Sequence, residues 1–416
     1  MIRPFEQAHF KAIVVGAGIV GLSCAFFLNR IGFKVTVVDR NLNGDRASFG
    51  NAGAVALPEF MPIAAPGIIW KIPSYLLNPY GPLFIRPSYL PRLWPYMRKF
   101  LAASKVRHYA ASATAMSSFL STAFEDHKTI HQAAGLGSLL RKDGHLWVYR
   151  SSAARDSSPD WNIRKNLGWN FEFLEKAELQ TVEPALGQRA KCAVRSEDWA
   201  TYTDPKAYVL ALMKYLRGKG VKFQTYDVCD IDGRDIINPD GRRMTFDKLV
   251  IAAGAWAHHL SKILGDPCPL ETERGYNTTL FKPGISLGRM ITFAQDHFVA
   301  TPMSMGLRIG GAVEFAGLDE PPDFKRSKAL LMLAKKYLPG LNIEGGTEWM
   351  GHRPSTPDSL PVIGRATRYK NVIYAFGHGH LGLTGSATTG RVVAEIICEK
   401  GPRPDLTPFR IERFAE

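Results

Sequence analysis

Cysteine is scarce and scattered in this chain. Its 416 residues hold five cysteines, and no two of them form a CxxC pair. Such spacing argues against a disulfide framework and against a thiolate zinc site, and it suits a reducing compartment. Low-complexity tracts are also missing, while 45% of the residues are hydrophobic. We therefore expect a globular protein, long enough for two domains or one large α/β unit.

Acidic residues are outnumbered by basic ones, and the formal net charge is +14. This excess favours anionic ligands or surfaces. The sequence has no basic run, no zinc-finger spacing and no basic stripe at helical intervals. Nucleic acid is therefore not expected as a partner.

Long apolar runs are lacking too. Residues 12–28, AIVVGAGIVGLSCAFFL, carry no charge over seventeen positions, but they include three glycines. The stretch is short for a membrane span. Only Arg3 and Lys11 precede it and no clear small-residue cleavage site follows, so it does not resemble a cleavable signal. We expect a cytoplasmic protein, either free or on the inner face of the plasma membrane.

The glycine spacing explains this stretch better. Gly16, Gly18 and Gly21 form a GxGxxG pattern after the apolar residues 12–15, and a β-branched segment, KVTVVDR, then ends near Asp39. A strand, helix and strand with this spacing bind a dinucleotide. Gly16 makes the tight turn, Gly18 lets the backbone approach the pyrophosphate, and Gly21 allows close helix–strand packing. Asp39 would bind a ribose hydroxyl. The pyrophosphate would lie at the helix N-terminus.

A second glycine-rich segment, FGHGHLGLTG at residues 376–385, follows the apolar run NVIYAF and precedes a helical pattern. Alone it fits a metal site, a catalytic base or a loop whose backbone contacts a ligand. As a loop, Leu381–Thr384 would present N–H groups at a helix N-terminus, where negative charge is stabilised.

Several motifs together resemble one family. VVGAGIVGLSCAFFL, VVDR, ASFGNAG, IAAGAW and RPSTPDSLPVIG…GHGHLGLTGS are similar to segments of the D-amino-acid oxidase superfamily of FAD enzymes, and most similar to its bacterial D-amino-acid dehydrogenase branch (small-subunit type). The motifs extend over essentially the whole chain. The resemblance implies an α/β fold with a discontinuous Rossmann-like FAD-binding domain and a substrate domain built on a mixed or antiparallel sheet. The expected FAD-binding segments are 1–58, 195–266 and 351–416, and the substrate-binding segments are 59–194 and 267–350.

The resemblance also implies site residues. Arg353 would bind the substrate carboxylate through its planar fork, Tyr276 would add a hydroxyl donor, and His378 would orient the loop or contact flavin or substrate. Arg274 and Arg308 are weaker candidates. Positions expected to contact FAD, which is expected to be bound non-covalently, are Gly16, Gly18, Ile19, Val20, Gly21, Asp39, Arg40, Ser48, Asn51, Ala52, Gly53, Val228, Ala253, Gly254, Gly364, Gly379, His380, Leu381, Gly382, Leu383 and Thr384.

Local patterns predict several elements. TDPKAYVLALMKYLRGKG predicts a helix with Asp204 as its cap and a buried apolar stripe, and NPDG predicts a hairpin turn. HLWVYR, GYNTTLF and LRIGGAVEFAG predict strands of the substrate domain.

Residues 60–124 contain no Asp or Glu, and their seven Lys and Arg residues account for half of the net charge. Proline, aromatic and large apolar residues alternate with these cations. One interpretation is a long irregular excursion packed on the substrate domain. The other is a surface, centred on residues 60–107, that contacts an anionic membrane. The resemblance favours the second interpretation, because these dehydrogenases are typically membrane-associated and pass electrons to quinone.

The expected function is oxidation of a D-amino acid by hydride transfer from Cα to flavin N5. This gives an imino acid that hydrolyses to a 2-oxo acid and ammonia, with electrons passed to a quinone or respiratory acceptor. An alternative is an oxidase or dehydrogenase of glycine, sarcosine or a cyclic imino acid such as D-hydroxyproline. Two other classes are a metal-dependent hydrolase using His378 and His380, which would lack an HExxH motif, and a nucleotide-binding module without turnover.

Overall fold

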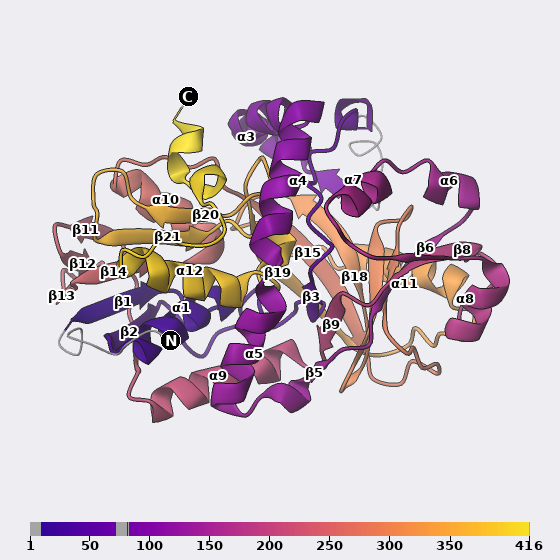
Figure 1. The fold of residues 1–416 in the computed structure, drawn as a ribbon, viewed down its shortest axis with the longest axis horizontal. Coiled ribbons are helices and arrows are strands. Elements are labelled where there is room, and N and C mark those ends of the chain that lie inside the picture. The colour runs from indigo at the N-terminus through magenta and orange to yellow at the C-terminus, as the bar shows by residue number, and fades with distance from the viewer. Residues whose placement is uncertain (1–9, 72–80, 82, 416) are drawn as a thin grey trace.

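Two large β-sheets form the framework of the molecule (Figure 1). The computed structural model describes residues 10–71, 81 and 83–415. In Figure 1 a six-stranded sheet lies on one side and a nine-stranded sheet on the other, while helices α4 and α5 run across the front between them. This mixed α/β architecture confirms the predicted fold class.

The six-stranded sheet has the order β10-β2-β1-β14-β21-β20. All its neighbouring strands are parallel except β20 and β21, which are antiparallel. Its strands are β1 (Lys11–Val15), β2 (Lys34–Asp39), β10 (Lys222–Thr225), β14 (Lys248–Ile251), β20 (Val362–Arg365) and β21 (Val372–Phe376).

Both faces of this sheet are covered because its strands are apolar on both sides. Ala12 and Val14 of β1 pack in one core with residues of α1 (Ile19–Arg30), α9 (Pro205–Gly218) and α12 (Ser386–Ile397). Ile13 and Val15 pack on the other face with α10 (Ala257–Ile263) and the small sheet of β11 (Asp230–Asp232), β12 (Asp235–Ile237) and β13 (Arg243–Thr245).

The nine-stranded sheet has the order β19-β15-β18-β17-β16-β6-β8-β7, and β4 pairs with β18. Helix α11 (Lys325–Tyr337) packs on β15 and β18. Its strands are β4 (Leu83–Ile85), β6 (His145–Tyr149), β7 (Glu172–Leu174), β8 (Cys192–Ser196), β15 (Glu271–Leu280), β16 (Met290–Phe293), β17 (Phe298–Met303), β18 (Gly306–Phe315) and β19 (Thr347–Ser355). A separate sheet joins β3 (Ala54–Ala56), β9 (Trp199–Tyr202) and β5 (Leu140–Arg141).

Most locally predicted elements are confirmed. Helix α9 begins after Asp204, whose side chain accepts a hydrogen bond from the Ala207 N–H at 3.0 Å. The NPDG turn connects the antiparallel strands β12 and β13, and the three predicted strands lie in β6, β15 and β18. The proposed domain boundaries at 195 and 351 fall inside β8 and β19, so we propose that the FAD-binding part resumes after Ser355.

The basic segment is largely helical, so an irregular excursion is the wrong description of its second half. Residues 87–134 contain α3 (Leu90–Ala103), α4 (Val106–Leu120) and α5 (Ala123–Ala134). Leu93, Met97 and Phe100 are buried at helical spacing along α3, and Pro91 and Pro95 in the same helix obscure this pattern in the sequence. Residues 72–80 and 82 of this segment lie outside the described residues.

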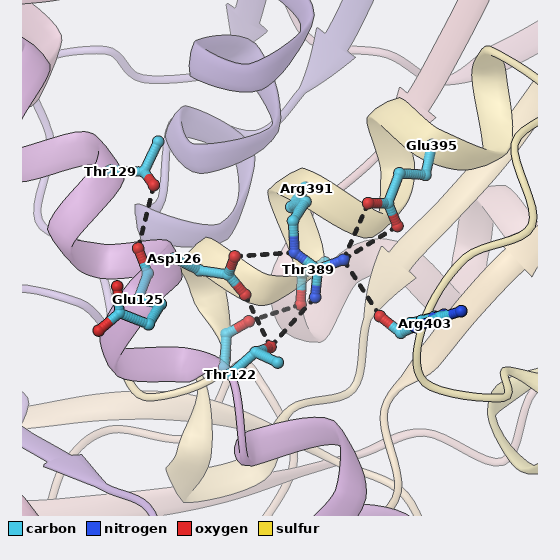
Figure 2. Close-up of polar contacts among 9 residues, drawn as sticks. Thr122, Glu125, Asp126, Thr129, Thr389, Arg391, Glu395 and Arg403 are labelled. Atoms are coloured by element: carbon cyan, nitrogen blue, oxygen red, sulfur yellow. Dashed lines mark hydrogen bonds and ion pairs between the residues drawn. The ribbon is translucent and has the colours of Figure 1, made fainter. Parts of the chain in front are cut away.

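An ion-pair network fixes α5 to α12 (Figure 2). Arg391 of α12 donates from Nε to Asp126 of α5 at 2.7 Å and from Nη2 to Thr122 at 3.1 Å, while its Nη1 contacts Glu395 at 2.9 Å. Asp126 is buried, so the pair is largely shielded from solvent. The network therefore sets the position of α5 against the helix that follows the second glycine-rich loop.

No helix within residues 10–71, 81 and 83–415 is long and apolar enough to cross a membrane.

Candidate active site

One large cavity, of about 1020 Å³, extends from the carboxyl ends of β1 and β2 to the nine-stranded sheet. In open α/β sheets, ligands bind in the crevice at the carboxyl ends of the strands. Residues from both large sheets and from the second glycine-rich loop line this cavity. A long ligand could therefore reach from one sheet to the other.

The first glycine-rich turn has no room for side chains. Gly16 adopts φ +110°, and a Cβ there would lie 2.3 Å from the Ala252 carbonyl oxygen. A Cβ on Gly21 would lie 1.9 Å from the Gly16 carbonyl oxygen, which explains the close packing of α1 on β1. Asp39 closes the turn from β2, because its carboxylate accepts a hydrogen bond from the Ala17 N–H at 2.8 Å.

The N-terminus of α1 offers free donors to the cavity. The Ile19 N–H donates to the Ser48 Oγ at 3.0 Å. The N–H groups of Gly18, Val20 and Gly21 have no acceptor among the described residues. Unpaired N–H groups and the helix dipole together favour an anion such as a pyrophosphate.

Two polar side chains of the nine-stranded sheet hold residues 49–51. Arg308 donates from Nη1 to the Asn51 carbonyl and from Nε to Thr279 at 3.0 Å, and Asn277 donates to the Gly50 carbonyl at 3.0 Å. Burial lowers the pKa of Arg308 to about 10, so the side chain remains a cation at neutral pH. Arg308 thus has a structural role at the site that the sequence did not indicate.

The side chain of Asn51 also stabilises this loop. Its Oδ1 accepts a hydrogen bond from the Gly53 N–H at 2.7 Å. A Cβ on Gly53 would lie 2.5 Å from the Tyr202 carbonyl oxygen, and Gly53 does not line the cavity. The loop itself thus uses this donor, and contact of Gly53 with the flavin stays a prediction.

At the far end of the cavity, β15 and β19 present one polar face. The cross-strand pairs on this face are Glu271 with Ser355, Glu273 with Arg353, Gly275 with Gly351, and Asn277 with Trp349. The indole ring of Trp349 lies over Gly351, where an added Cβ would be 1.9 Å from the ring. Because Gly275 and Gly351 lie opposite each other, the middle of this face has no side chain of its own. The side chains of residues in the neighbouring pairs cover the glycine backbone instead.

Arg353 lies on this bare patch. A Cβ on Gly275 would be 2.4 Å from the Arg353 Cζ, so the guanidinium rests on the backbone of β15. None of the described residues accepts a hydrogen bond from this guanidinium or lies within ion-pair distance of it. Burial lowers the pKa of Arg353 and the nearby Glu273 opposes this shift. Arg353 is thus a cation that has no anionic partner among the described residues.

The structure does not bring Tyr276 and Arg353 together. Tyr276 contributes to the cavity wall, but its hydroxyl donates to the Glu314 carboxylate at 2.6 Å and accepts from the Asp323 N–H at 3.2 Å. Glu273 is paired with Arg353, and Tyr276 lies three residues further on, so its side chain points to the opposite face of the sheet. The hydroxyl is thus bonded to Glu314, and its contact with the substrate carboxylate stays a prediction.

Arg274, the other weak candidate, also lies on that opposite face. It is fully buried, and its Nη1 lies 3.3 Å from the Glu314 carboxylate. Its contacts are those of a buried structural ion pair.

His378 lies in the second glycine-rich loop, next to β19 through an isolated bridge to Ser355. The Thr389 hydroxyl donates to the Gly385 carbonyl at 2.8 Å, so it accepts from the His378 Nε2–H, also at 2.8 Å. The proton therefore resides on Nε2 and Nδ1 is free. Burial lowers the pKa of His378 to about 3, so the ring is neutral.

The same loop presents backbone donors. The N–H groups of Gly382, Leu383 and Thr384 have no acceptor among the described residues, and all three residues line the cavity. His380 lies close to both Glu273 and Arg353. Burial lowers its pKa, and Glu273 and Arg353 shift it in opposite directions.

A buried chain of three aromatic side chains supports this loop from behind. The His127 Nε2 lies 3.1 Å from the carbonyl oxygens of both Leu383 and Thr384, so this nitrogen must carry the proton. Its Nδ1 then accepts from the Tyr202 hydroxyl at 2.9 Å, and that oxygen accepts from the His131 Nε2–H at 2.6 Å. Burial lowers the pKa of both histidines to about 4. No pattern in the sequence predicts this support.

Most residues predicted to bind the cofactor line the cavity, and three do not. Gly21 contacts the turn from behind, Gly53 packs on β9, and Gly364 lies in β20 beside Arg410. The predicted residues that line the wall are Gly16, Gly18, Ile19, Val20, Asp39, Arg40, Ser48, Asn51, Ala52, Val228, Ala253, Gly254, Gly379, His380, Leu381, Gly382, Leu383 and Thr384.

These features fit FAD. The turn at Gly16 has no room for a side chain, the start of α1 has free N–H groups, and the loop at 382–384 supplies further donors at a distance along the same cavity. Arg40 lies 3.8 Å from the centre of the Trp256 ring beside the cavity. No group of three or more potential metal ligands occurs in the part of the chain that the structure describes.

Comparisons with known proteins show the family of this chain. The profile of the FAD dependent oxidoreductase family (DAO) matches residues 11–396. The chain is 36% identical, over 96% of its length and 98% of the relative's, to a D-amino-acid oxidase of Bradyrhizobium diazoefficiens. It is 31% identical, over 97% of its length and 99% of the relative's, to a D-amino acid dehydrogenase of the same organism. Its fold resembles that of glycine oxidase from Geobacillus kaustophilus, with a TM-score of 0.73, 20% identity and coverage of 97% and 99% of the two chains.

Proposed function

Because the chain belongs to the FAD dependent oxidoreductase family, we propose that it oxidises D-amino acids at Cα. FAD is the cofactor, and when bound it accepts the hydride that leaves Cα. Loss of this hydride together with one proton from the ammonium group, which passes to solvent, would give an imino acid that hydrolyses to a 2-oxo acid and ammonia. Both curated relatives named above act on D-amino acids by their names, which supports this stereochemistry.

The observation that carries the proposal is the unpaired guanidinium of Arg353. It faces the cavity from β19, and no described residue satisfies it. A planar guanidinium binds a carboxylate through two parallel hydrogen bonds. Arg353 would therefore fix one end of an amino acid and hold its Cα in a constant place.

The remaining groups of the site orient the substrate and the cofactor and take no chemical part in the reaction. His378 is neutral and its Nε2–H is used by Thr389, so only the Nδ1 lone pair can accept a hydrogen bond from a ligand. The N–H groups of Gly382, Leu383 and Thr384 would stabilise negative charge on the cofactor ring. Removal of a hydride needs no obligatory protein base at this loop.

We also propose that FAD is bound without a covalent link. No cysteine is among the described residues that line the cavity, and Gly50 stands where some relatives carry a histidine that links the flavin. Acid precipitation should therefore release the flavin, and yellow colour retained in the protein pellet would contradict this.

The electron acceptor is proposed to be a membrane quinone. Trp70 and Trp94 are 85% and 60% exposed. Trp94 lies on α3, at one end of the molecule in Figure 1, and Ile68, two residues before Trp70, packs in one cluster with Leu93 of α3. Exposed cations, among them Arg92, Arg98 and Arg107, accompany the two tryptophans, and the segment 60–124 has no acid. Exposed indoles with cations and without acids suit an anionic lipid surface.

The proposal is tested by the variant Arg353→Met in the FAD-bound protein. Loss of two charge-assisted hydrogen bonds of about 1.5–3 kcal/mol each predicts a fall in kcat/KM for the D-amino acid of about 100-fold or more. Stopped-flow reduction under anaerobic conditions measures this effect. Arg217→Met, on the exposed surface of α9, is the matched control and should behave as wild type. Unchanged kinetics of Arg353→Met would refute the role of Arg353.

A further inference from the structure

Two opposite charges face the cavity from neighbouring strands without pairing. Glu273 of β15 and Arg353 of β19 are direct cross-strand partners, and both line the cavity. Directly opposite Cβ atoms in such a pair lie only about 4.5–5.5 Å apart. Even so, no ion pair joins the two side chains, although many carboxylates elsewhere in the described chain have one.

The two side chains lean apart along the strands. Arg353 lies toward the pair of Gly275 and Gly351, with its Cζ over Gly275. Glu273 turns the other way, because its Oε1 accepts from the Ser355 hydroxyl at 2.6 Å, and Ser355 belongs to the next pair in that direction. Ser355 in turn accepts from the Tyr96 hydroxyl at 3.4 Å. The Glu273 and Arg353 side chains are thus kept apart by the hydrogen bond of Glu273 to Ser355 and by the packing of Arg353 on Gly275.

One oxygen of Glu273 is left without a donor. Glu273 is 3% exposed, and its Oε2 accepts no hydrogen bond from any described residue. Because Glu273 lines the cavity, this oxygen is open to a donor from a ligand, and a carboxylate in a largely buried residue gains more from such a bond than an exposed one. The neighbouring His380 supplies no positive charge, since burial lowers its pKa. Glu273 therefore lacks a cationic donor in the same way that Arg353 lacks an anionic acceptor.

We infer that Glu273 receives the ammonium group of the amino acid whose carboxylate Arg353 holds. The inference rests on the proposed function and extends it. An amino acid carries its two opposite charges on the same carbon, and this face offers two complementary charges that are kept from each other. The N–H of the ammonium donates to Glu273 Oε2, and the carboxylate oxygens accept from the Arg353 guanidinium. Both charged groups are then satisfied by one zwitterion.

This assignment defines a substrate class. Acids with a free α-amino or α-imino nitrogen satisfy both groups. A 2-hydroxy acid or a plain carboxylic acid would leave Glu273 without a cationic donor. Its carboxylate, bound to Arg353, would also lie near the Glu273 carboxylate with no ammonium group to offset the repulsion between the two negative charges. The site should therefore discriminate strongly against acids that lack the nitrogen, because an unpaired buried charge costs more than a lost contact.

The test compares ligands that differ only in the ammonium group, bound to the FAD-loaded enzyme. The pairs are D-alanine with propionate and D-leucine with 4-methylpentanoate, and the pair used is the one whose amino acid reduces the wild type faster. The variant is Glu273→Gln. Glu271→Gln is the matched control, since Glu271 lies two residues earlier on the same face and bonds Tyr89 at 2.9 Å.

Glu273→Gln should raise the KM of the amino acid by about 30-fold or more, from loss of one charged hydrogen bond. The same variant should bind the plain acid as tightly as wild type or a few-fold more tightly, because a negative charge has been removed. Arg353→Met should weaken both ligands, and Glu271→Gln neither. FAD content and melting temperature show whether each variant is folded.

Equal weakening of both ligands, or no change in either, would overturn the inference while leaving the proposed function intact. A wild-type enzyme that oxidises no D-amino acid of a broad panel would instead refute the proposed function.

Discussion

At the residue scale, the position of Arg353 depends on a neighbour that has no side chain. The guanidinium occupies the place that a methyl group would take on Gly275. Gly275 adopts no left-handed backbone conformation, so its role is to provide space and not flexibility. A glycine in the middle of a strand often marks such a close approach.

Gly275→Ala should therefore displace Arg353 without unfolding the protein. The added Cβ would be 2.4 Å from the Cζ, and the flexible end of the arginine can move to relieve this contact. We expect the KM of the D-amino acid to rise about tenfold, which corresponds to about 1.4 kcal/mol, with a melting temperature within a few degrees of wild type. Steady-state kinetics and thermal unfolding measure the two quantities.

Gly288→Ala is the control for this variant, because its nearest neighbour, a Glu183 oxygen, would be an ordinary 3.6 Å away. A large loss of stability in Gly275→Ala with normal KM in the surviving fraction would contradict this role for Gly275.

The sequence identifies some residues of the site and misses others for a physical reason. The dinucleotide turn is predictable, because local spacing determines it, and Arg353 is indicated by its motif. The sequence does not show that Tyr276 and Arg353 point to opposite faces of the sheet, because the face that a strand residue occupies depends on register within the sheet. Glu273 has no local signal and Arg308 is only a weak candidate in the sequence, because the partners that define their roles are distant in the chain.

At the element scale, the second glycine-rich loop is held by elements from elsewhere in the chain. Helix α5 supplies His127 to the loop carbonyls, and β9 supplies Tyr202 to His127. Arg391 fixes α5 to α12 (Figure 2). The loop thus derives its shape from tertiary contacts, and its glycines alone do not determine it.

This support predicts acid sensitivity. Burial lowers the pKa of His127 to about 4, while histidine in an unfolded chain titrates near 6.5. Between these values the unfolded chain binds a proton that the folded chain does not. The contribution of neutral His127 to the free energy of unfolding is therefore fully present above about pH 6.5 and is lost as the pH falls toward 4. The loss over this range is on the order of 3 kcal/mol.

Urea unfolding of the FAD-bound protein between pH 4.5 and 8 tests this. His127→Gln should be less stable than wild type at pH 8, and the two proteins should converge as the pH falls. His108→Gln, at an exposed position of α4, should follow wild type throughout. Curves for His127→Gln and wild type that stay parallel over the whole range would contradict the account.

Helices and strands with clear periodicity were predictable at this scale. Helix α9 has its cap, apolar stripe and terminal glycine in sequence. Helix α3 was not predicted, because Pro91 and Pro95 suggest an irregular segment, although Pro91 lies in its first turn, where proline is tolerated.

At the scale of the whole molecule, the distribution of charge matters more than its sum. Half of the net charge comes from residues 60–124, where exposed tryptophans lie as well. This concentration predicts that the FAD-bound protein co-sediments with vesicles that contain anionic phospholipid, and that salt weakens the binding.

The double variant Trp70→Ser and Trp94→Ser should lose most of this binding. Phe281→Ser removes an exposed aromatic residue elsewhere, 55% exposed, and should have no effect. The absence of salt-sensitive binding by the intact protein would remove the case for a membrane acceptor.

Oxidation of D-amino acids by this protein is tested by an anaerobic titration of the FAD-bound protein with both enantiomers of the same amino acids. We expect that a D-amino acid bleaches the visible flavin absorbance, that its L-enantiomer does not, and that Arg353→Met greatly slows the bleaching. Equal bleaching by both enantiomers, or none by any D-amino acid in a broad panel, would contradict this expectation.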